Sequence, residues 1–483
     1  MIAIKDVDLR VVNMRTRMPF RYGIATLTAT PHVFVRLLVE VDGRPQWGIS
    51  ADHLPPKWFT KDPQSSVRHD TEQMIAQLRS AVHIATSAGP AGTVFELWRR
   101  IESGQREFGR RNNMPPLLLN FGVSLVERAV ISACCRAWGR AFPRAVRENR
   151  LGIDFGQLPY KDLAGKEPGD LLPPQPLRAV AARHTVGLAD PLTDGDIPPG
   201  EKLDDGLPQS LEQCIRYYGL THFKIKLLGR IEPDLERLRR LAEVISREVR
   251  VGDYRFTLDA NENFKSIAPF EQFWRRLTAE PALKPFLAKL IFVEQPLHRE
   301  VALSDDVRRE MLAWADRPPM IIDESDGDLG DVQRALDCGY VGTSHKNCKG
   351  IMKSVANACA LELRRRKDPA GTYVLSGEDL ANVGPVALLE DLAAVGTLGV
   401  THVERNGQHY FRGLSMFPPQ VQEQVLRHHG DLYRRHPQGF PALNIQHGQL
   451  DIGSTIDAPF GIDFDLDTSA FTPLSEWKYE SLE

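Results

Sequence analysis

The sequence predicts an α/β protein in which a closed parallel (β/α) barrel follows an N-terminal α+β unit. From residue 206 onward, short apolar segments alternate with amphipathic helical segments, which is the order expected of a parallel barrel. Several of the apolar segments end in a lysine or a carboxylate, at the edge where a barrel carries its active site. An open doubly wound sheet is the alternative, but no predicted strand is followed by a Gly-rich phosphate-binding motif.

Residues 1–150 are expected to form the α+β unit, because a hairpin pattern is followed by helical patterns. Apolar residues alternate from Val33 to Val41, ahead of an Asp-Gly turn. Two segments punctuated by proline or glycine, Met18–Gly23 and Ser50–Pro56, are predicted to be loops on either side of this hairpin. The last helix of the unit is predicted to begin at Ser124–Glu127, which has the form of a capping box.

The rest of the chain divides into three predicted parts. Residues 151–205 are rich in proline, glycine and aspartate, and we expect a loop-rich connection that contains the first barrel strand near 183–188. A surface insertion is the simplest interpretation of its length. Residues 206–415 are predicted to form the barrel domain with the candidate site, and residues 416–483 a C-terminal segment that packs on the N-terminal unit.

The barrel elements follow from their patterns, and together with the early strand they give seven or eight strands. The predicted helices span residues 233–249, 270–277, 304–314, 332–338, 351–366 and 386–395. The predicted strands span residues 223–227, 255–261, 290–296, 320–325, 340–346, 372–377 and 400–405.

Composition indicates an ordinary globular protein of the cytoplasm. The chain has 483 residues, of which 42% are hydrophobic, and its net charge is −3, so no basic surface for nucleic acid is expected. The segment Met1–Asp8 is interrupted by charges and lacks the apolar core of a signal peptide. No apolar segment approaches eighteen residues, so we expect no membrane span. The six cysteines lack metal-ligand spacing and are expected to be reduced.

Side chains able to bind a metal or move a proton stand at the ends of five consecutive predicted barrel strands. Taken singly, each acid is more readily explained as a helix cap, and two lysines on one strand face as a solvated surface. Five strand ends in order favour a shared site, where converging carboxylates would need a cation such as Mg²⁺ between them. In chain order these residues are Lys224 and Lys226, Asp259 and Asn261, Glu294, Asp323 and Glu324, and Lys346.

A cation at this edge could hold a substrate carboxylate and stabilise the charge that forms when the adjacent carbon loses a proton. Lysine is a plausible base for that proton, although its ordinary pKa of about 10.4 is high. A metal ion, a second ammonium group and partial burial all favour the neutral amine. Lys224, on the same strand face as Lys226, would supply one such positive charge.

These motifs make the chain similar to the enolase superfamily, in its muconate-lactonizing enzyme/mandelate racemase branch. The resemblance covers most of the chain and implies a TIM-like (β/α)7β barrel with an N-terminal α+β capping domain. It also implies Mg²⁺ as the cofactor, a small-molecule carboxylate as the substrate, and a homo-oligomer. It rests on K-x-K at Lys224 and Lys226, D-x-N at Asp259 and Asn261, E-Q-P at Glu294–Pro296, D-E-S at Asp323–Ser325, and Lys346.

The resemblance also implies a role for each residue. Lys226 and Lys346 would be the acid/base pair on opposite faces of the substrate, and Lys224 would contact the substrate carboxylate. The segments 18–25 and 50–54 would close over the site and select the substrate. The Mg²⁺ ligands would be Asp259, Glu294 and Asp323. Residues expected to contact the substrate, or to support residues that do, are Asn261, Glu324, Glu378, Asp379, Tyr22 and His53.

Three features depart from the family pattern. The glycine pair that usually follows the second lysine is replaced by Lys349-Gly350, so Lys349 is an alternative to Lys346. We favour Lys346 because it lies nearer the strand end. The last barrel strand lacks the paired aspartates with which dipeptide epimerases hold an amino group, which disfavours a dipeptide substrate. Glu378 and Asp379 stand near the predicted mouth, and a structural role is favoured for both.

The sequence therefore predicts an enzyme that removes the proton α to a carboxylate through a metal-stabilised enolate. Racemisation or epimerisation, cycloisomerisation and syn-elimination of water from a hydroxy acid are all compatible with two lysines. A Schiff-base lyase that uses Lys226 or Lys346 as nucleophile is an alternative. A catalytically silent barrel that acts as a binding subunit is another, disfavoured by the intact set of acids and lysines.

Overall fold

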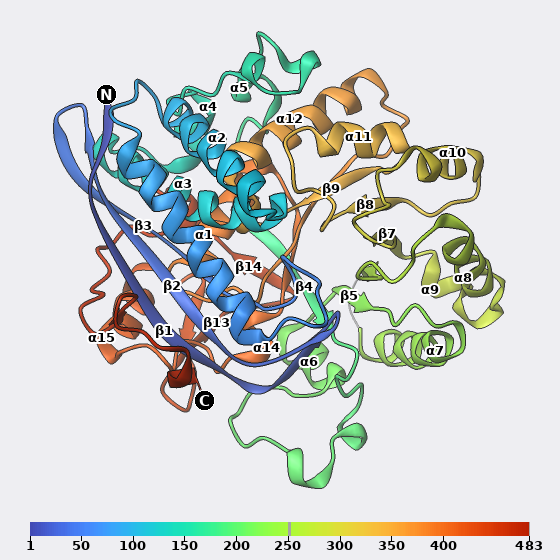
Figure 1. The fold of residues 1–483 in the computed structure, drawn as a ribbon. Coiled ribbons are helices and arrows are strands. Elements are labelled where there is room, and N and C mark those ends of the chain that lie inside the picture. Colours follow the sequence, from blue (N-terminus) through green and yellow to red (C-terminus); the bar gives the residue numbers. More distant parts are fainter. Residues whose placement is uncertain (250–252, 483) are drawn as a thin grey trace.

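The centre of the molecule is a closed barrel of parallel strands (Figure 1). The structure, a computed structural model, describes residues 1–249 and 253–482. Eight strands follow one another around the barrel in chain order, and β11 pairs with β4 to close it. They are β4 (Ala179–Val186), β5 (His222–Lys226), β6 (Arg255–Asp259), β7 (Leu290–Glu294), β8 (Met320–Ile322), β9 (Gly342–His345), β10 (Val374–Gly377) and β11 (His402–Arg405). The predicted closed barrel is confirmed.

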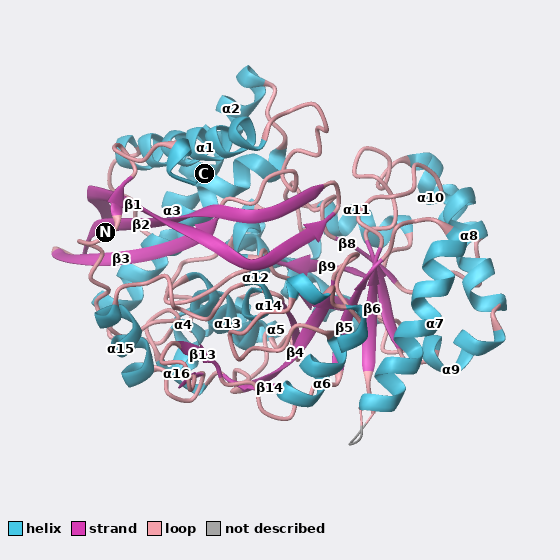
Figure 2. Cartoon of the chain, turned by 90° about the horizontal axis from the view of Figure 1, so that it is seen from below, coloured by secondary structure: helices cyan, strands magenta, loops and turns pink. Residues whose placement is uncertain are grey.

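At least one helix lies in each connection between successive barrel strands, which makes the barrel (β/α)7β. Figure 2 shows α7, α8 and α10 on the outer side of the strands. In chain order the helices are α6 (Leu211–Tyr218), α7 (Ile231–Glu248), α8 (Ile267–Ala279) with α9 (Lys284–Leu287), α10 (Asp305–Ala313), α11 (Asp331–Cys338), α12 (Ile351–Lys367) and α13 (Ala387–Leu398).

Strand β5 shows why these segments form a barrel wall with a polar interior. Phe223 and Ile225 are buried in the hydrophobic core, while Lys224 and Lys226 alternate with them and face the barrel mouth. Helix α7, which follows β5, buries an apolar stripe that includes Leu235 and faces away from solvent. The two-residue period of the strand and the 3.6-residue period of the helix thus each bury one face, as the sequence pattern requires.

The N-terminal domain is an antiparallel sheet covered by three helices. The sheet contains β1 (Ile2–Tyr22), β2 (Ala25–Val41), β3 (Arg44–His53) and the late strand β15 (Thr472–Pro473), in the order β15-β1-β2-β3. Helices α1 (Val67–Ser87), α2 (Val94–Asn112) and α3 (Pro116–Trp138) follow, and α3 packs on β2 and β3. This is the α+β capping domain that the resemblance implies.

The two loops predicted at Met18–Gly23 and Ser50–Pro56 are mostly strand, so these predictions were wrong. β1 continues to Tyr22 and pairs with β2 down to the Tyr22–Ala25 pair, which leaves only a two-residue turn. β3 continues to His53, which pairs with His32 of β2. Pro19 interrupts the sequence pattern, but it lies where the register shifts between Arg15 and Phe20, and a missing N–H is tolerated at such an irregularity.

The predicted capping box at Ser124–Glu127 does not begin a helix either. Helix α3 begins eight residues earlier, at Pro116, and Ser124 is buried in its middle. Glu127 instead reaches the barrel domain, where its carboxylate accepts hydrogen bonds from the backbone N–H groups of Ile351 (3.1 Å) and Met352 (2.6 Å). It therefore caps the N-terminus of α12, the helix that follows the candidate lysine Lys346.

The remaining elements connect or join the two domains. Strand β14 pairs antiparallel with β4 of the barrel, and β15 pairs antiparallel with β1 of the capping domain. Before the barrel lie α4 (Phe142–Arg147) and α5 (Pro168–Leu171). After it lie α14 (Gly407–Tyr410), α15 (Pro419–His428), β12 (Tyr433–Arg435), β13 (Pro441–Leu443), β14 (Gln449–Asp451), α16 (Gly453–Asp457) and β15 (Thr472–Pro473).

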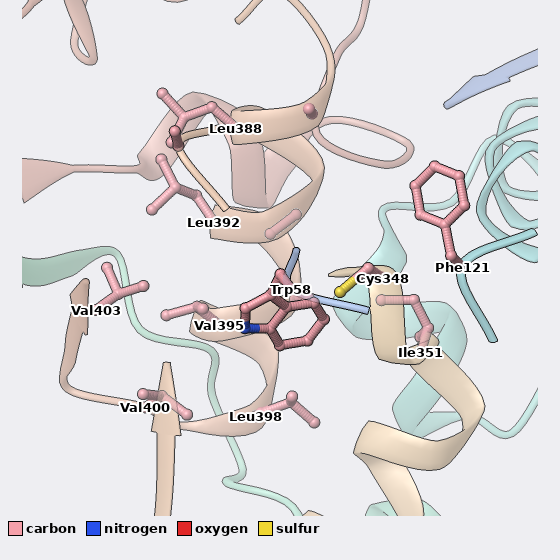
Figure 3. Close-up of a cluster of buried hydrophobic side chains, with 14 of the residues drawn as sticks. Trp58, Phe121, Cys348, Ile351, Leu388, Leu392, Val395, Leu398, Val400 and Val403 are labelled. Atoms are coloured by element: carbon pink, nitrogen blue, oxygen red, sulfur yellow. The ribbon is translucent and has the colours of Figure 1, made fainter. Parts of the chain in front are cut away.

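One hydrophobic cluster extends through both domains. Figure 3 shows Trp58 and Phe121 of the capping domain together with Ile351 of α12 and Leu392 of α13. Helix α3 is long and apolar enough to cross a membrane by length and composition, but 94% of the relevant window is buried inside the structure. A core helix passes the same test, and burial of this extent favours that interpretation. All six cysteines are free and buried.

A buried ion cluster also joins the domains. Arg128 of α3 is fully buried and forms ion pairs with Asp52 of β3 and, at 2.8 Å, with Glu390 of α13. Its guanidinium also donates a hydrogen bond to the backbone oxygen of Ala51 (3.0 Å). One cation thus compensates two carboxylates at the contact between the capping domain and the barrel.

The Glu390→Gln variant should flatten the pH dependence of stability. Burial, reinforced by the Asp52 carboxylate and opposed by Arg128, raises the pKa of Glu390 to about 8, whereas an unfolded chain has a value of about 4.3. The folded state therefore binds a proton that the unfolded state releases, so this contribution is complete below pH 4.3 and is lost as pH rises to 8. Urea midpoints measured between pH 5 and 8 would test this. If the urea midpoint of Glu390→Gln depends on pH as steeply as that of the wild type, Glu390 is not the titrating group. The same flattening in the exposed control Glu236→Gln would also contradict this role for Glu390.

Candidate active site

A pocket of about 460 Å³ lies at the carboxyl ends of the barrel strands and is lined by residues of both domains. The barrel contributes most of its charged groups, and the capping domain contributes mainly apolar side chains. The lining residues are Phe20, Tyr22, Leu27, Pro55, Trp58, Lys224, Lys226, Asp259, Asn261, Asp323, Lys346, Asp379, Leu380, Ala381, Glu404 and Asn406. All three lysines predicted from the strand ends are among them.

Lys224 lies at the centre of a group of four carboxylates. Its Nζ atom is 2.7 Å from both Glu294 and Glu378, 3.0 Å from Glu404 and 3.1 Å from Asp259. Burial alone would lower the pKa of Lys224, but these carboxylates together raise it well above its ordinary value. Lys224 therefore carries a fixed positive charge in this structure.

Lys226 is two residues further along the same face and contacts a single carboxylate. Its Nζ atom lies 2.5 Å from Oδ2 of Asp259. The other carboxylate oxygen of Asp259, Oδ1, accepts a hydrogen bond from the backbone N–H of Asn261 at 2.9 Å. Burial would raise the pKa of Asp259, but Lys224 and Lys226 lower it below its usual range.

Lys346 and Lys349 both contact Asp323, but only Lys346 lines the pocket. The Lys346 ammonium lies 2.7 Å from Oδ2 of Asp323 and 4.3 Å from the centre of the Trp58 ring. Lys349 lies 2.9 Å from the other oxygen, Oδ1, of Asp323 and donates to the Ser344 hydroxyl at 2.7 Å. This geometry favours Lys346 as the residue that meets a substrate. Burial would raise the pKa of Asp323, but the two ammonium groups lower it well below its ordinary value.

The three carboxylates expected to hold Mg²⁺ are all buried and stand at or just after the ends of three neighbouring strands. Asp259 ends β6, Glu294 ends β7, and Asp323 follows β8. Burial and the neighbouring carboxylates, Asp259 foremost, raise the pKa of Glu294 well above its ordinary value. A group of hard oxygen ligands with excess negative charge suits Mg²⁺, so the residues present fit this ion.

The other predicted residues separate into two groups. Tyr22, Asn261 and Asp379 line the pocket. Glu378, Glu324 and His53 do not line it, although all three are buried. Glu378 forms an ion pair with Lys224, Glu324 lines a separate pocket with Arg299, and His53 packs against His32 and Phe411.

Sequence reasoning missed several residues in or beside this site, among them Glu404, Arg183 and Trp58. Glu404 on β11 contacts Lys224. Polar residues two positions apart, His402 and Glu404, were the available sign that one face of this strand is polar. Arg183 on β4 is fully buried and pairs with Glu378, and an arginine within a strand was a comparable signal. Trp58 lies in an irregular segment after β3, and no pattern in the sequence indicated that it reaches Lys346.

No family model matches the chain, and no curated protein sequence is significantly similar to it. Solved structures, in contrast, match over nearly the whole chain. An N-succinyl Arg/Lys racemase from Bacillus cereus ATCC 14579 is 16% identical, with a TM-score of 0.55, and the match covers 93% of this chain and 95% of that one.

Two further solved structures show the same similarity. A muconate lactonizing enzyme from Pseudomonas fluorescens, complexed with muconolactone, is 15% identical with a TM-score of 0.51, over 83% of this chain and 87% of that one. An enolase from Bradyrhizobium, complexed with magnesium and mandelic acid, is 13% identical with a TM-score of 0.55, over 94% and 95% of the two chains. At these identities the similarity establishes the architecture, and the chain shares the capped (β/α)7β barrel fold of these racemase, lactonizing-enzyme and enolase structures.

Proposed function

We propose that the protein is a Mg²⁺-dependent enzyme that removes the proton α to a substrate carboxylate and returns a proton to the same carbon or to a rearranged product. The observation that carries this proposal is the placement of Lys226 and Lys346. They come from different strands, both line one pocket, and each contacts a carboxylate of the candidate metal site.

The chain's own residues supply the proton transfers. One lysine, as the neutral amine, would accept the α-proton, and the electron pair of the broken C–H bond would delocalise into the carboxylate to give an enolate. The other lysine, as the ammonium, would deliver a proton to the opposite face, which inverts the centre. Lys224, held charged by its four carboxylates, would face the negative charge of the substrate.

The candidate metal ligands are Asp259, Glu294 and Asp323. A Mg²⁺ ion held there would supply a Lewis acid facing the substrate carboxylate, and its charge would favour the neutral form of a neighbouring amine. The racemases and lactonizing enzymes that share this fold support racemisation, epimerisation or cycloisomerisation as the outcome. Elimination of water from a 2,3-dihydroxy acid would use the same pair of lysines, and product analysis distinguishes these outcomes.

Solvent-deuterium exchange tests the proposal directly. In ²H₂O with MgCl₂, the enzyme should exchange the α-proton of at least one acid in a panel of 2-hydroxy acids, 2-aryl acids and N-acyl amino acids, followed by NMR. EDTA should reduce that exchange at least about 100-fold, and added Mg²⁺ should restore it. Activity that survives EDTA, together with a covalent enzyme–substrate adduct that borohydride traps, would instead support the Schiff-base lyase. Absence of exchange from the whole panel would contradict the proposal.

A further inference from the structure

We infer that the substrate is a monocarboxylate whose α-carbon carries an uncharged, apolar alkyl or aryl group. This inference rests on the proposed function, because it assigns the pocket's charged side to the reacting carboxylate. It is drawn from how the remaining walls of the pocket are built.

An apolar wall of the pocket is formed by Phe20 and Leu27 of the capping domain and by Leu380 of the barrel domain. Phe20 and Leu27, from the β1–β2 hairpin, form a small core with Tyr410, and the rings of Phe20 and Tyr410 stack at 4.1 Å. Trp58 also lines the pocket, but its ring lies 4.3 Å from the Lys346 ammonium, so it belongs to the charged side. The apolar wall stabilises an apolar substituent, because contact between the two removes both from water.

The polar atom of Tyr22 in this wall is already engaged. The Tyr22 hydroxyl donates a hydrogen bond to the backbone oxygen of Pro56 at 2.9 Å, so its ring and not its hydroxyl is offered to the pocket.

A second carboxylate on the substrate would find no partner at the apolar wall. Among the described residues that line the pocket, the cations are Lys224, Lys226 and Lys346, and each contacts an acid at the metal-site end. An anion placed against the apolar wall would lose its hydration without gaining an ion pair. Dicarboxylic acids with the second group on that side are therefore disfavoured.

An ammonium group on the substrate would have to compete with protein donors for the carboxylates of the pocket. Asp379 accepts hydrogen bonds from the backbone N–H groups of Asn382 (2.7 Å) and Asn406 (3.2 Å). Glu404 accepts from the Thr185 hydroxyl at 2.6 Å and from Lys224 at 3.0 Å. Protein donors thus already occupy part of the acceptor capacity of both carboxylates, which weakens the interaction that either could offer a substrate ammonium group.

Matched acids that differ only in the charge of the distal group test this inference. The first series is mandelate with its 4-carboxy and 4-aminomethyl derivatives, and the second is N-acetylphenylalanine with N-acetylglutamate and N-acetyllysine. In the exchange assay, the neutral member of a series that exchanges should have a kcat/KM at least about tenfold above both charged members. A charged member that equals or exceeds the neutral one would overturn the inference while leaving the proposed function intact.

A charge placed in the apolar wall gives an independent measurement. Leu380→Lys should shift the ratio of kcat/KM for 4-carboxymandelate over mandelate upward by about tenfold or more, since the new ammonium can pair with the distal carboxylate. Leu426→Lys, at a partly buried leucine of α15 outside the pocket, is the matched control and should leave the ratio unchanged. An unchanged ratio in a folded Leu380→Lys enzyme would show that the substituent does not lie on this wall. If the wild-type enzyme exchanges the α-proton of no acid tested, the proposed function itself is contradicted.

Discussion

Lys346→Ala and Lys226→Ala should each lose α-proton exchange from one stereoisomer of a substrate, by about 100- to 10,000-fold, while retaining exchange from the other. The reason is that each ammonium group lines the pocket from a different strand and pairs with a different acid, Asp323 or Asp259. The measurement is the initial rate of deuterium incorporation into each pure enantiomer, followed by NMR. Circular dichroism would confirm that the variants remain folded.

Lys349→Ala is the matched control for this experiment. Lys349 touches Asp323 and Ser344 but does not line the pocket, so its loss should affect both enantiomers to the same extent. Equal loss from both enantiomers in Lys226→Ala or in Lys346→Ala would point to a single base. An enantiomer-specific defect in Lys349→Ala would move the second acid/base role from Lys346 to Lys349.

Arg128→Met should destabilise the folded protein by about 3–5 kcal/mol, because it leaves two buried carboxylates without their cation. Asp52 and Glu390 are both fully buried and are contributed by different domains, so neither can recover water without separating the capping domain from the barrel. Chemical denaturation at pH 8 would measure the loss.

The triple variant Arg128→Met/Asp52→Asn/Glu390→Gln separates two explanations of that loss. If uncompensated charge causes it, removing both carboxylates should recover most of the stability. If the triple variant is as unstable as Arg128→Met alone, the packing of the arginine side chain is responsible. Arg136→Met, at a partly exposed arginine of the same helix, should cost much less.

The barrel could be predicted from the sequence because its strands are short, apolar and regularly alternated with amphipathic helices. Each strand end also carries its functional residue within one or two positions of the last ladder pair, as Asp259 and Glu294 do. A parallel barrel brings all such ends to one rim, so order along the chain becomes proximity in space. That is why the lysines of the pocket, and its acids other than Glu404, could be predicted from residue type and spacing.

The capping domain was predicted less well, because residues typical of turns and helix caps take other roles there, set by contacts with distant parts of the chain. Pro19 resembles a loop residue until its position at a register shift in the β1–β2 ladder is known. Ser124 and Glu127 have the spacing of a capping box, yet α3 buries both, and Glu127 caps a helix more than 200 residues away. Hydrogen bonds over such separations leave no periodic trace in the sequence.

The surroundings of Lys224 were also beyond sequence reasoning. Lys224, Glu378 and Glu404 come from three different strands, and their mutual contacts depend on where β10 and β11 lie across the barrel from β5. The sequence suggested a lysine that assists its neighbour, whereas the structure shows an ammonium group shared by four acids. Trp58 likewise reaches Lys346 from an irregular segment whose path is set by tertiary packing.

The pairing of β15 with β1 has a consequence for the order in which the molecule assembles. The edge of the N-terminal sheet is completed by Thr472 and Pro473, and the side chain of Arg10 donates to the backbone oxygen of Phe471, 461 residues away. Because β15 follows the barrel in the chain, the ribosome makes β1, β2 and β3 well before the strand that pairs with the edge of their sheet. The capping domain, and with it the apolar wall of the pocket, can therefore reach its final form only after the barrel has been translated.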